Sequence, residues 1–163
     1  MADSIRPCIT FKERTEEAVK LYTSIVPNSK ILNLTKFETE GGPIPKGQVL
    51  NASFTLDGRE FRAFDGGETF TFSEGISLWV NCRTQEEVDR YWTALTANGG
   101  EEGPCGWLKD PFGVSWQIVP EQLGQMLSDP KSGDAEACMN AMLKMKKLDI
   151  AALESAYRGS RVA

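Results

Sequence analysis

Apolar residues recur at the spacing of one buried helix face in two stretches of the chain that lie seventy residues apart. The first stretch carries Ala18, Leu21, Tyr22 and Ile25, and the second carries Val88, Tyr91, Trp92 and Leu95. Both sets follow the i, i+3, i+4, i+7 pattern of an amphipathic helix. A long period that occurs twice indicates a duplicated supersecondary unit, because a solenoid needs three or more copies.

Strand patterns surround both helices. In the first unit, residues 5–12 and 30–37 alternate between apolar and polar side chains and predict strands. Residues 48–56 and 60–65 predict a hairpin, because Asp57-Gly58 between them is a strong turn signal. The expected order of this unit is therefore βαβββ.

The second unit repeats this order after a linker rich in glycine, residues 66–75. Residues 76–82 predict a strand, and shorter strands are expected at 103–108 and 114–119. Residues 121–163 lie outside the repeat and predict a helical tail.

Polar residues mark the expected helix starts. We expect Thr15 to cap the first helix and Thr84 to cap the second, where Glu87 completes a capping box. In the tail, Asp149 is the expected cap of a helix, and Leu148 is placed to contact Leu153.

These patterns predict an α+β protein with one domain, residues 1–163. It is expected to consist of a first unit at 5–66, a second unit at 76–120 and the tail at 121–163. We expect the two units to form curved mixed sheets around a cavity, because the space between the halves of a duplicated fold is a natural place for a ligand.

Composition excludes several classes of protein. The chain has 163 residues, of which 40% are apolar and 25% charged, and its net charge of −5 comes with no basic cluster. We therefore expect no nucleic-acid partner and no membrane partner. No apolar run approaches the ~20 residues that span a bilayer, and the N-terminus shows no secretory signal. The four cysteines are widely spaced, which predicts free thiols and a cytoplasmic protein.

Four sequence runs carry a resemblance to a known superfamily. Residues 110–117, Asp-Pro-Phe-Gly-Val-Ser-Trp-Gln, resemble the closing motif of the vicinal oxygen chelate superfamily, the glyoxalase and bleomycin-resistance fold. Residues 100–110 and 115–120 are similar to its PhnB-like branch, which is often labelled demethylubiquinone methyltransferase-like, and residues 141–153 resemble the tail of that branch. The resemblance extends over roughly residues 5–158.

The resemblance implies which faces of the strands matter. In the superfamily each helix packs on one face of its sheet, and the other face lines a cavity for a small molecule. Alternation then assigns one set of strand residues to the cavity, namely Cys8, Thr10, Ser77, Trp79 and Gln117, whereas the opposite set meets the helices, namely Ile9, Phe11, Leu78 and Val80. Trp107 is expected to contribute a second aromatic wall, and the resemblance also implies a homodimer.

The expected metal positions carry poor ligands. The superfamily's metalloenzymes use His and Glu at positions that fall here on Cys8, Ser77, Gln117 and near Ala63. The chain has no histidine, which removes the commonest metal ligand and the commonest general base. We therefore expect neither a metal nor another cofactor. Asp65 is expected on the same face as Ala63, either as a substitute carboxylate or as a turn residue ahead of Gly66-Gly67.

Several residues and functions stay open at this point. Trp79 and Trp107 either stack on a flat ligand or pack in the core, and Gln117 bonds either a ligand or its neighbours. Cys8 is either an inert thiol or a nucleophile, and Phe70 and Phe72 either cover the cavity mouth or form an edge strand. The protein is predicted to bind a small molecule, with catalysis undecided and no catalytic residue assigned. The alternatives are a methyltransferase, for which no Gly-x-Gly-x-x-Gly loop is present, and non-catalytic sequestration of a drug-like molecule.

Overall fold

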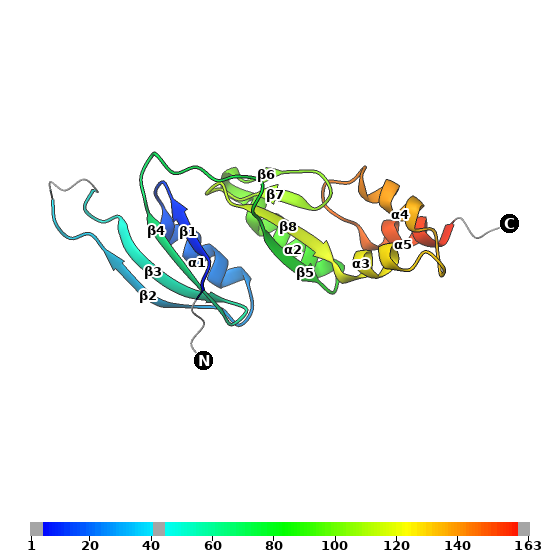
Figure 1. Ribbon diagram of the computed structural model, residues 1–163, viewed down its shortest axis with the longest axis horizontal. Coiled ribbons are helices and arrows are strands. Elements are labelled where there is room, and N and C mark those ends of the chain that lie inside the picture. Colours follow the sequence, from blue (N-terminus) through cyan, green and yellow to red (C-terminus); the bar gives the residue numbers. More distant parts are fainter. Residues whose placement is uncertain (1–4, 41–44, 160–163) are drawn as a thin grey trace. The chain divides into compact units, whose positions relative to one another are not determined.

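A computed structural model describes residues 5–40 and 45–159 of the chain (Figure 1). It has five α-helices and two mixed sheets within that described part, as expected for an α+β protein. Contacts divide the chain into two compact units between Thr71 and Phe72, and each unit is described by itself. None of the described helices is long and apolar enough to cross a membrane.

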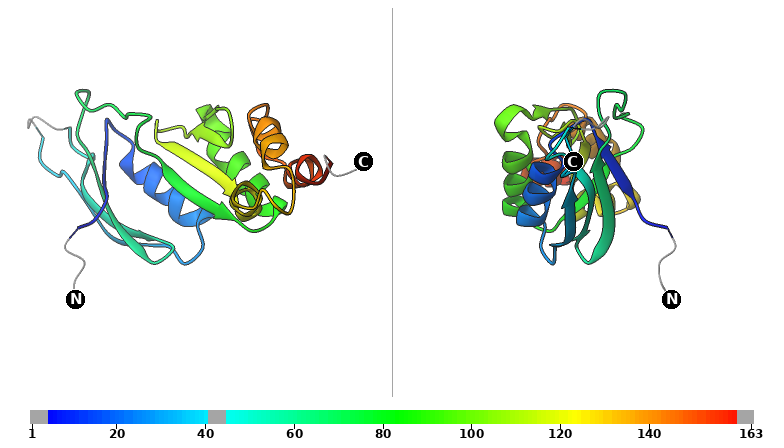
Figure 2. Two further views of the ribbon diagram at one scale, coloured as in Figure 1. Left: turned by 45° about the vertical axis from the view of Figure 1, so that its right-hand side comes forward. Right: turned by 90° about the vertical axis from the view of Figure 1, so that its left-hand side faces the viewer.

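The first unit has the predicted βαβββ order. Its elements are β1 (Cys8–Phe11), α1 (Thr15–Ile25), β2 (Lys30–Lys36), β3 (Val49–Leu56) and β4 (Arg59–Asp65). The strands lie in the order β1-β4-β3-β2, and only the pair of β1 and β4 is parallel. Figure 2 shows α1 against one face of this sheet.

The second unit repeats this arrangement in shorter form. Its elements are β5 (Leu78–Cys82), α2 (Gln85–Thr96), a 3₁₀ turn η1 (Ala97–Gly99), β6 (Glu101–Glu102), β7 (Trp107–Lys109) and β8 (Ser115–Pro120). The strand order β5-β8-β7-β6, with β5 parallel to β8, matches the first sheet.

One predicted strand of this unit is wrong. Residues 103–108 were expected to form a single strand, but the chain turns between β6 and β7. Cys105 and Gly106 have φ values of 56° and 85°, which a strand does not allow. A Cβ at position 106 would lie 2.8 Å from the Ile118 carbonyl oxygen, so this turn also requires glycine for space.

The helices bury one face each, as the sequence pattern predicts. All four apolar residues of the second set, from Val88 to Leu95, are buried. In α1 the buried apolar residues are Ala18, Val19 and Tyr22, whereas Leu21 and Ile25 are half-buried. The linker residues also pack within their own units. Phe70 lies over Gly66 near Thr10, and Phe72 lies over Gly113.

Asp65, rather than Thr15, holds the start of α1. Its Oδ1 accepts hydrogen bonds from the Thr15 backbone N–H (3.0 Å) and hydroxyl (2.6 Å), and its Oδ2 accepts one from the Val49 N–H (2.6 Å). Thr15 is the first helical residue, and Arg14 before it has a left-handed φ of 68°. The predicted Thr15 cap is therefore wrong. In the second unit, the predicted Thr84 cap is confirmed, because the Thr84 hydroxyl accepts from the Glu87 N–H. The capping box is not complete, since the Glu87 carboxylate accepts from the N–H of Arg83 and not from that of Thr84.

The tail folds into three short helices that belong to the second unit. These are α3 (Glu121–Ser128), α4 (Ala135–Met142) and α5 (Ile150–Gly159). They enclose a small core of their own with the end of β8, formed by Val119, Leu123, Met126, Cys138, Leu148 and Leu153. Asp149 caps α5 as predicted, since its Oδ1 accepts from the Ala152 N–H at 2.8 Å.

Gln85 fastens this tail to the first turn of α2. Its Nε2 donates to the Leu148 carbonyl oxygen at 3.1 Å, and its Oε1 accepts from the Ile150 N–H at 2.9 Å. A single amide thus satisfies two backbone groups at the start of α5, where backbone N–H groups have no partner within the helix.

Replacing Asp65 by Asn is expected to destabilise the protein by about 1–3 kcal/mol, because an amide cannot accept all three hydrogen bonds. Urea unfolding measures the loss. Asp57→Asn is the matched control, since Asp57 lies at an exposed turn with a φ of 47° that Asn tolerates. Equal stability of the two variants would contradict the role given to Asp65.

Replacing Gln85 by Ala is expected to cost about 1–3 kcal/mol, because two buried backbone groups lose their partner. Hydrogen exchange should show the loss of protection concentrated at Ile150 and the following turn of α5. Gln125→Ala, on the exposed side of α3, should change neither quantity. Unchanged exchange at α5 in the Gln85 variant would show that the tail is held by other contacts.

Candidate functional site

Alternation along the strands of the second sheet separates two sets of side chains. Leu108, Trp116 and Ile118 are buried on the side of α2. The buried Cys82 thiol lies on this side too, close enough to Glu87 and Arg90 of α2 for their charges to act on it. The face opposite α2 therefore carries the other set, which consists of Trp79, Asn81, Trp107, Lys109, Ser115, Gln117 and Val119.

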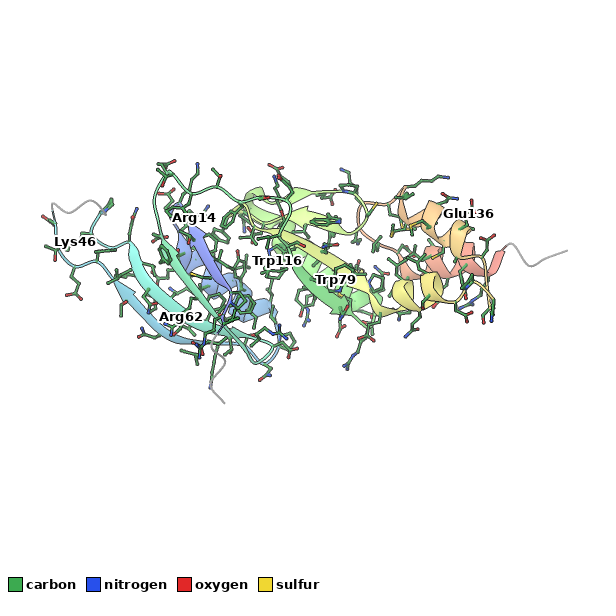
Figure 3. All side chains as sticks on the ribbon, viewed as in Figure 1. Arg14, Lys46, Arg62, Trp79, Trp116 and Glu136 are labelled. Carbon is green, nitrogen blue, oxygen red and sulfur yellow. The ribbon has the colours of Figure 1, made fainter. Side chains whose placement is uncertain are left out.

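Three of the predicted residues form a row across this face. Trp79 on β5 is paired with Gln117 on β8, and Gln117 is paired with Trp107 on β7. The Trp79 side chain is 57% exposed and Trp107 is half-buried, so neither is a core residue (Figure 3). The row places an amide between two indole rings, which suits a flat ligand with a polar edge.

Hydrogen bonds orient the members of this row. The Gln117 Nε2 donates to the Ser77 hydroxyl at 2.8 Å, so Ser77 joins the row from the start of β5. The Trp79 Nε1 donates to the Asn81 Oδ1 at 2.7 Å. The first contact links β8 to the residue before β5, and the second lies along β5 itself.

A pocket of about 500 Å³ begins at this row. Trp107, Lys109 and Ser115 line it from β7 and β8, Glu101 lines it from β6, and Pro104 lines it from the β6–β7 turn. An ion pair between Lys109 and Glu74 lies at this pocket and holds the pKa of the Glu74 carboxyl below its usual value. An aromatic row thus lies next to a mostly apolar hollow that carries one ion pair.

The face opposite α1 in the first sheet has a different chemistry. The register aligns Cys8 on β1, Arg62 on β4, Ser53 on β3 and Asn33 on β2. Thr10 follows Cys8 on the same face of β1 and is half-buried beside Gly66 and Phe70. This row is polar throughout, whereas the row of the second sheet is aromatic.

Asp65 does not lie on this face. It is 3% exposed on the α1 side of β4, where its carboxylate holds Thr15 and Val49. Ala63 is also buried on the α1 side. The register places Arg62 beside Cys8 and Gln117 beside Trp79, so Arg62 and Gln117 are counterparts once Cys8 is matched with Trp79 and not with Ser77. Arg62 was not predicted because the positions were counted across hairpins of unequal length, two residues at Asp57-Gly58 but five from Asp110 to Val114.

The thiols differ in their surroundings. Cys8 is exposed, and partial burial of its sulfur raises its pKa although the Arg62 guanidinium and a hydrogen bond with Thr10 oppose the shift. Burial raises the pKa of Cys82 to about 12, and Cys138 is buried with a raised pKa as well. A thiol with a raised pKa is a poor nucleophile at neutral pH.

The donor set does not fit the divalent metal that the resemblance associates with this fold. Within residues 5–40 and 45–159, no three His, Cys, Asp or Glu side chains are grouped to hold an ion. The positions in question carry Cys8, Ser77 and Gln117, and the fourth is Arg62, whose fixed positive charge repels a metal cation. No chemical step is therefore assigned to a metal.

The motif that carries the resemblance is a structural turn. The Asp110 Oδ1 accepts from the N–H groups of Phe112 (2.9 Å) and Val114 (3.0 Å), and its Oδ2 accepts from the Trp116 Nε1 at 2.8 Å. Asp110 is 3% exposed. Its carboxylate shapes the turn into β8 and so sets which β8 side chains face away from α2.

Comparison with known proteins gives the family. Residues 3–119 match the family described as 3-demethylubiquinone-9 3-methyltransferase. The chain belongs to this family. A PhnB protein of Bacillus cereus that carries the same methyltransferase name is 35% identical, and the similarity covers 72% of this chain and 99% of that protein with a TM-score of 0.65.

More distantly related solved structures share only the fold with this PhnB-like chain. A protein from Pseudomonas aeruginosa is 22% identical over 72% of this chain and 96% of its own, with a TM-score of 0.60. A fosfomycin resistance protein from Listeria monocytogenes, solved with Mn(II) and sulfate, is 15% identical over 71% and 89%, with a TM-score of 0.50. No curated protein matches the chain. These likenesses place it in the glyoxalase and bleomycin-resistance fold. The family match ends before the tail, so the tail's own resemblance stays a prediction.

Exposure of Trp79 predicts a fluorescence result. Of the four tryptophans, Trp92 and Trp116 are 4% and 1% exposed, whereas Trp79 is 57% exposed. Acrylamide should quench a steep component of the emission, and Trp79→Phe should remove most of that component. Trp107→Phe should remove a smaller share, because Trp107 is half-buried. Steep quenching that persists in the Trp79 variant would contradict the open placement of this ring.

Proposed function

We propose that this PhnB-like protein binds a small, flat molecule on the face opposite α2, by stacking on Trp79 and Trp107. The observation that supports this proposal is the row in which Gln117 lies between the two indole rings. Offset or edge contacts between aromatic rings contribute about 0.5–1.5 kcal/mol each beyond the area that they bury. Two such contacts together with burial of the exposed Trp79 ring are enough for a ligand of modest size.

Gln117 is the polar group that would form hydrogen bonds with the edge of this ligand. Its amide nitrogen is held by the Ser77 hydroxyl, so the amide plane is oriented before a ligand arrives. The amide oxygen accepts no hydrogen bond from the described residues, and it is placed to accept one from a ligand N–H or O–H. This division of roles gives the row a preference for a flat molecule with a donor on its edge.

Methyl transfer, which the family name implies, has little support in this chain. The typical methyl-donor site uses a glycine-rich loop in a doubly wound parallel sheet, whereas both sheets here are four-stranded with one parallel pair each. We regard the name as a label of the family and not as the activity of this protein.

Binding without turnover is the other reading that the row favours. No described side chain of the row is a general base, and the chain has no histidine. Sequestration of a planar, drug-like molecule needs only the two rings and the amide. A catalytic role would need charge stabilisation from another side chain, because no metal is assigned.

We further propose that the protein is cytoplasmic, in keeping with its free thiols. We also propose that it forms a homodimer, as its resemblance to the superfamily implies.

The proposal predicts how variants of the row bind planar compounds. A set of planar aromatic compounds is screened against the wild type by ligand-observed NMR, and affinities of the hits are measured by calorimetry. Trp79→Ala and Trp107→Ala should each weaken binding by about tenfold, and Gln117→Leu should weaken only ligands with an edge donor. Leu143→Ala is the control, because Leu143 is an equally exposed apolar residue (58%) directly after α4.

Three results would contradict the proposal. Hits whose affinity does not depend on Trp79 or Trp107 would place the ligand elsewhere. Stoichiometric Mn or Zn retained after dialysis, measured by elemental analysis, would restore a metal centre. Heat of binding with S-adenosylmethionine would support the methyltransferase reading instead.

A further inference from the structure

The face opposite α1 carries an excess of positive charge. Its described charged side chains are Lys30, Glu60 and Arg62, and Arg6 precedes β1 with the same alternation. One carboxylate therefore stands among three cations, although the whole chain has a net charge of −5. A local excess of the opposite sign to the net charge attracts anions to that place.

The Glu60 carboxylate forms its shorter ion pair with Arg6. The Glu60 Oε2 lies 2.8 Å from the Arg6 Nε, whereas its Oε1 lies 3.5 Å from the Arg62 Nε. The second contact is too long for a good hydrogen bond. Arg62 is thus only partly neutralised by its acidic neighbour.

The remaining contact of Arg62 is also loose. Its Nη1 donates to the Asn51 Oδ1 at 3.4 Å, and among the described residues none forms a hydrogen bond or an ion pair with Nη2. A guanidinium has five N–H donors and holds carboxylate or phosphate oxygens in a two-pronged geometry. The loosely held Arg62 fork is therefore available to a ligand.

Short side chains lie across the sheet from Arg62. Its neighbours on the adjacent strands are Cys8 on β1 and Ser53 on β3, and Asn33 follows on β2. The Arg62 side chain, labelled in Figure 3, is 44% exposed.

We infer that the face opposite α1 binds an oxyanion, a carboxylate or phosphate-type group of a small molecule, through the Arg62 guanidinium. This inference goes beyond the proposed function, because it concerns a separate face in the other unit of the chain. The site belongs to the position that corresponds to Gln117 in the other unit, so the repeat supplies a fixed cation in one copy and a neutral amide in the other. Asn51 and Ser53 would orient the bound oxygens.

The Cys8 thiol allows a direct test because it is exposed next to Arg62. The rate of alkylation of each cysteine by iodoacetamide is measured by peptide mass spectrometry at a pH of about 8.5, near the ordinary pKa of a thiol. Inorganic phosphate and acetate are added in separate arms, and sodium chloride keeps the ionic strength constant. We expect the oxyanion to slow alkylation of Cys8 and to leave Cys105, which is half-buried, unchanged.

Variants separate Arg62 from general charge effects. Arg62→Gln should raise the oxyanion concentration that gives half-maximal protection by about tenfold or more, because a charge-assisted fork is lost. Arg59→Gln is the matched control, since Arg59 pairs with Leu56 on the other alternation of β4. Glu60→Gln should lower the half-protecting concentration, because it removes the only described carboxylate near Arg62 on this face.

Each outcome of the alkylation experiment either supports or overturns the inference. Protection by phosphate alone, by acetate alone or by both supports the inference and identifies the type of oxyanion. No protection of Cys8, equal protection of Cys105, or protection that survives in Arg62→Gln overturns it. If Arg62→Gln does not fold by circular dichroism, the Glu60→Gln variant carries the test, and unchanged protection in it overturns the inference. Trp79→Ala should keep the protection, so failure of the aromatic row is distinguishable from failure of this site.

Discussion

Packing of one amphipathic helix on one face of each sheet is the constraint on which the rest of this structure depends. Burial of Tyr22 in one unit and Trp92 in the other fixes which alternate strand residues lie in the core. Every other strand side chain must then point to the opposite face. The chemistry of that face follows from a packing requirement, because a shift of one residue in register would bury Gln117 and expose Trp116.

Two buried carboxylates keep this register in place. Asp65 ties the end of β4 to the start of α1, and Asp110 holds the turn that leads into β8. Each accepts three hydrogen bonds from groups that would otherwise lack partners. The two acids that the sequence presents near the expected site thus serve the fold, and the faces opposite the helices carry amide, hydroxyl, thiol and guanidinium groups instead.

Much of the fold could be predicted from the sequence because helix periodicity and turn residues are local signals. The duplicated βαβββ order, the Thr84 cap and the Asp149 cap are all confirmed. The position of Asp65 could not be predicted, because the extra residue Arg14 and the unequal hairpins shift the alternation between the units. The strand face of Trp79, Trp107 and Gln117 could be predicted because these residues lie close to a helix or turn with a clear sequence signal, whereas their role as ligand contacts stays a prediction. Arg62 was missed because its role depends on pairing with Cys8, a contact between distant parts of the chain.

The small core formed by the tail helices covers one end of β8, and this limits the direction in which a ligand on the second sheet could extend. Val119 lies two positions beyond Gln117 on β8 and is buried among Leu123, Met126 and Leu148. That end of the strand is covered, whereas the other end leads to Ser115 and the hollow beside Lys109. A compound that binds as proposed and extends along β8 would therefore extend toward the ion pair of Lys109 and Glu74. The three short helices thereby give one half of an otherwise symmetrical repeat a closed end and a direction.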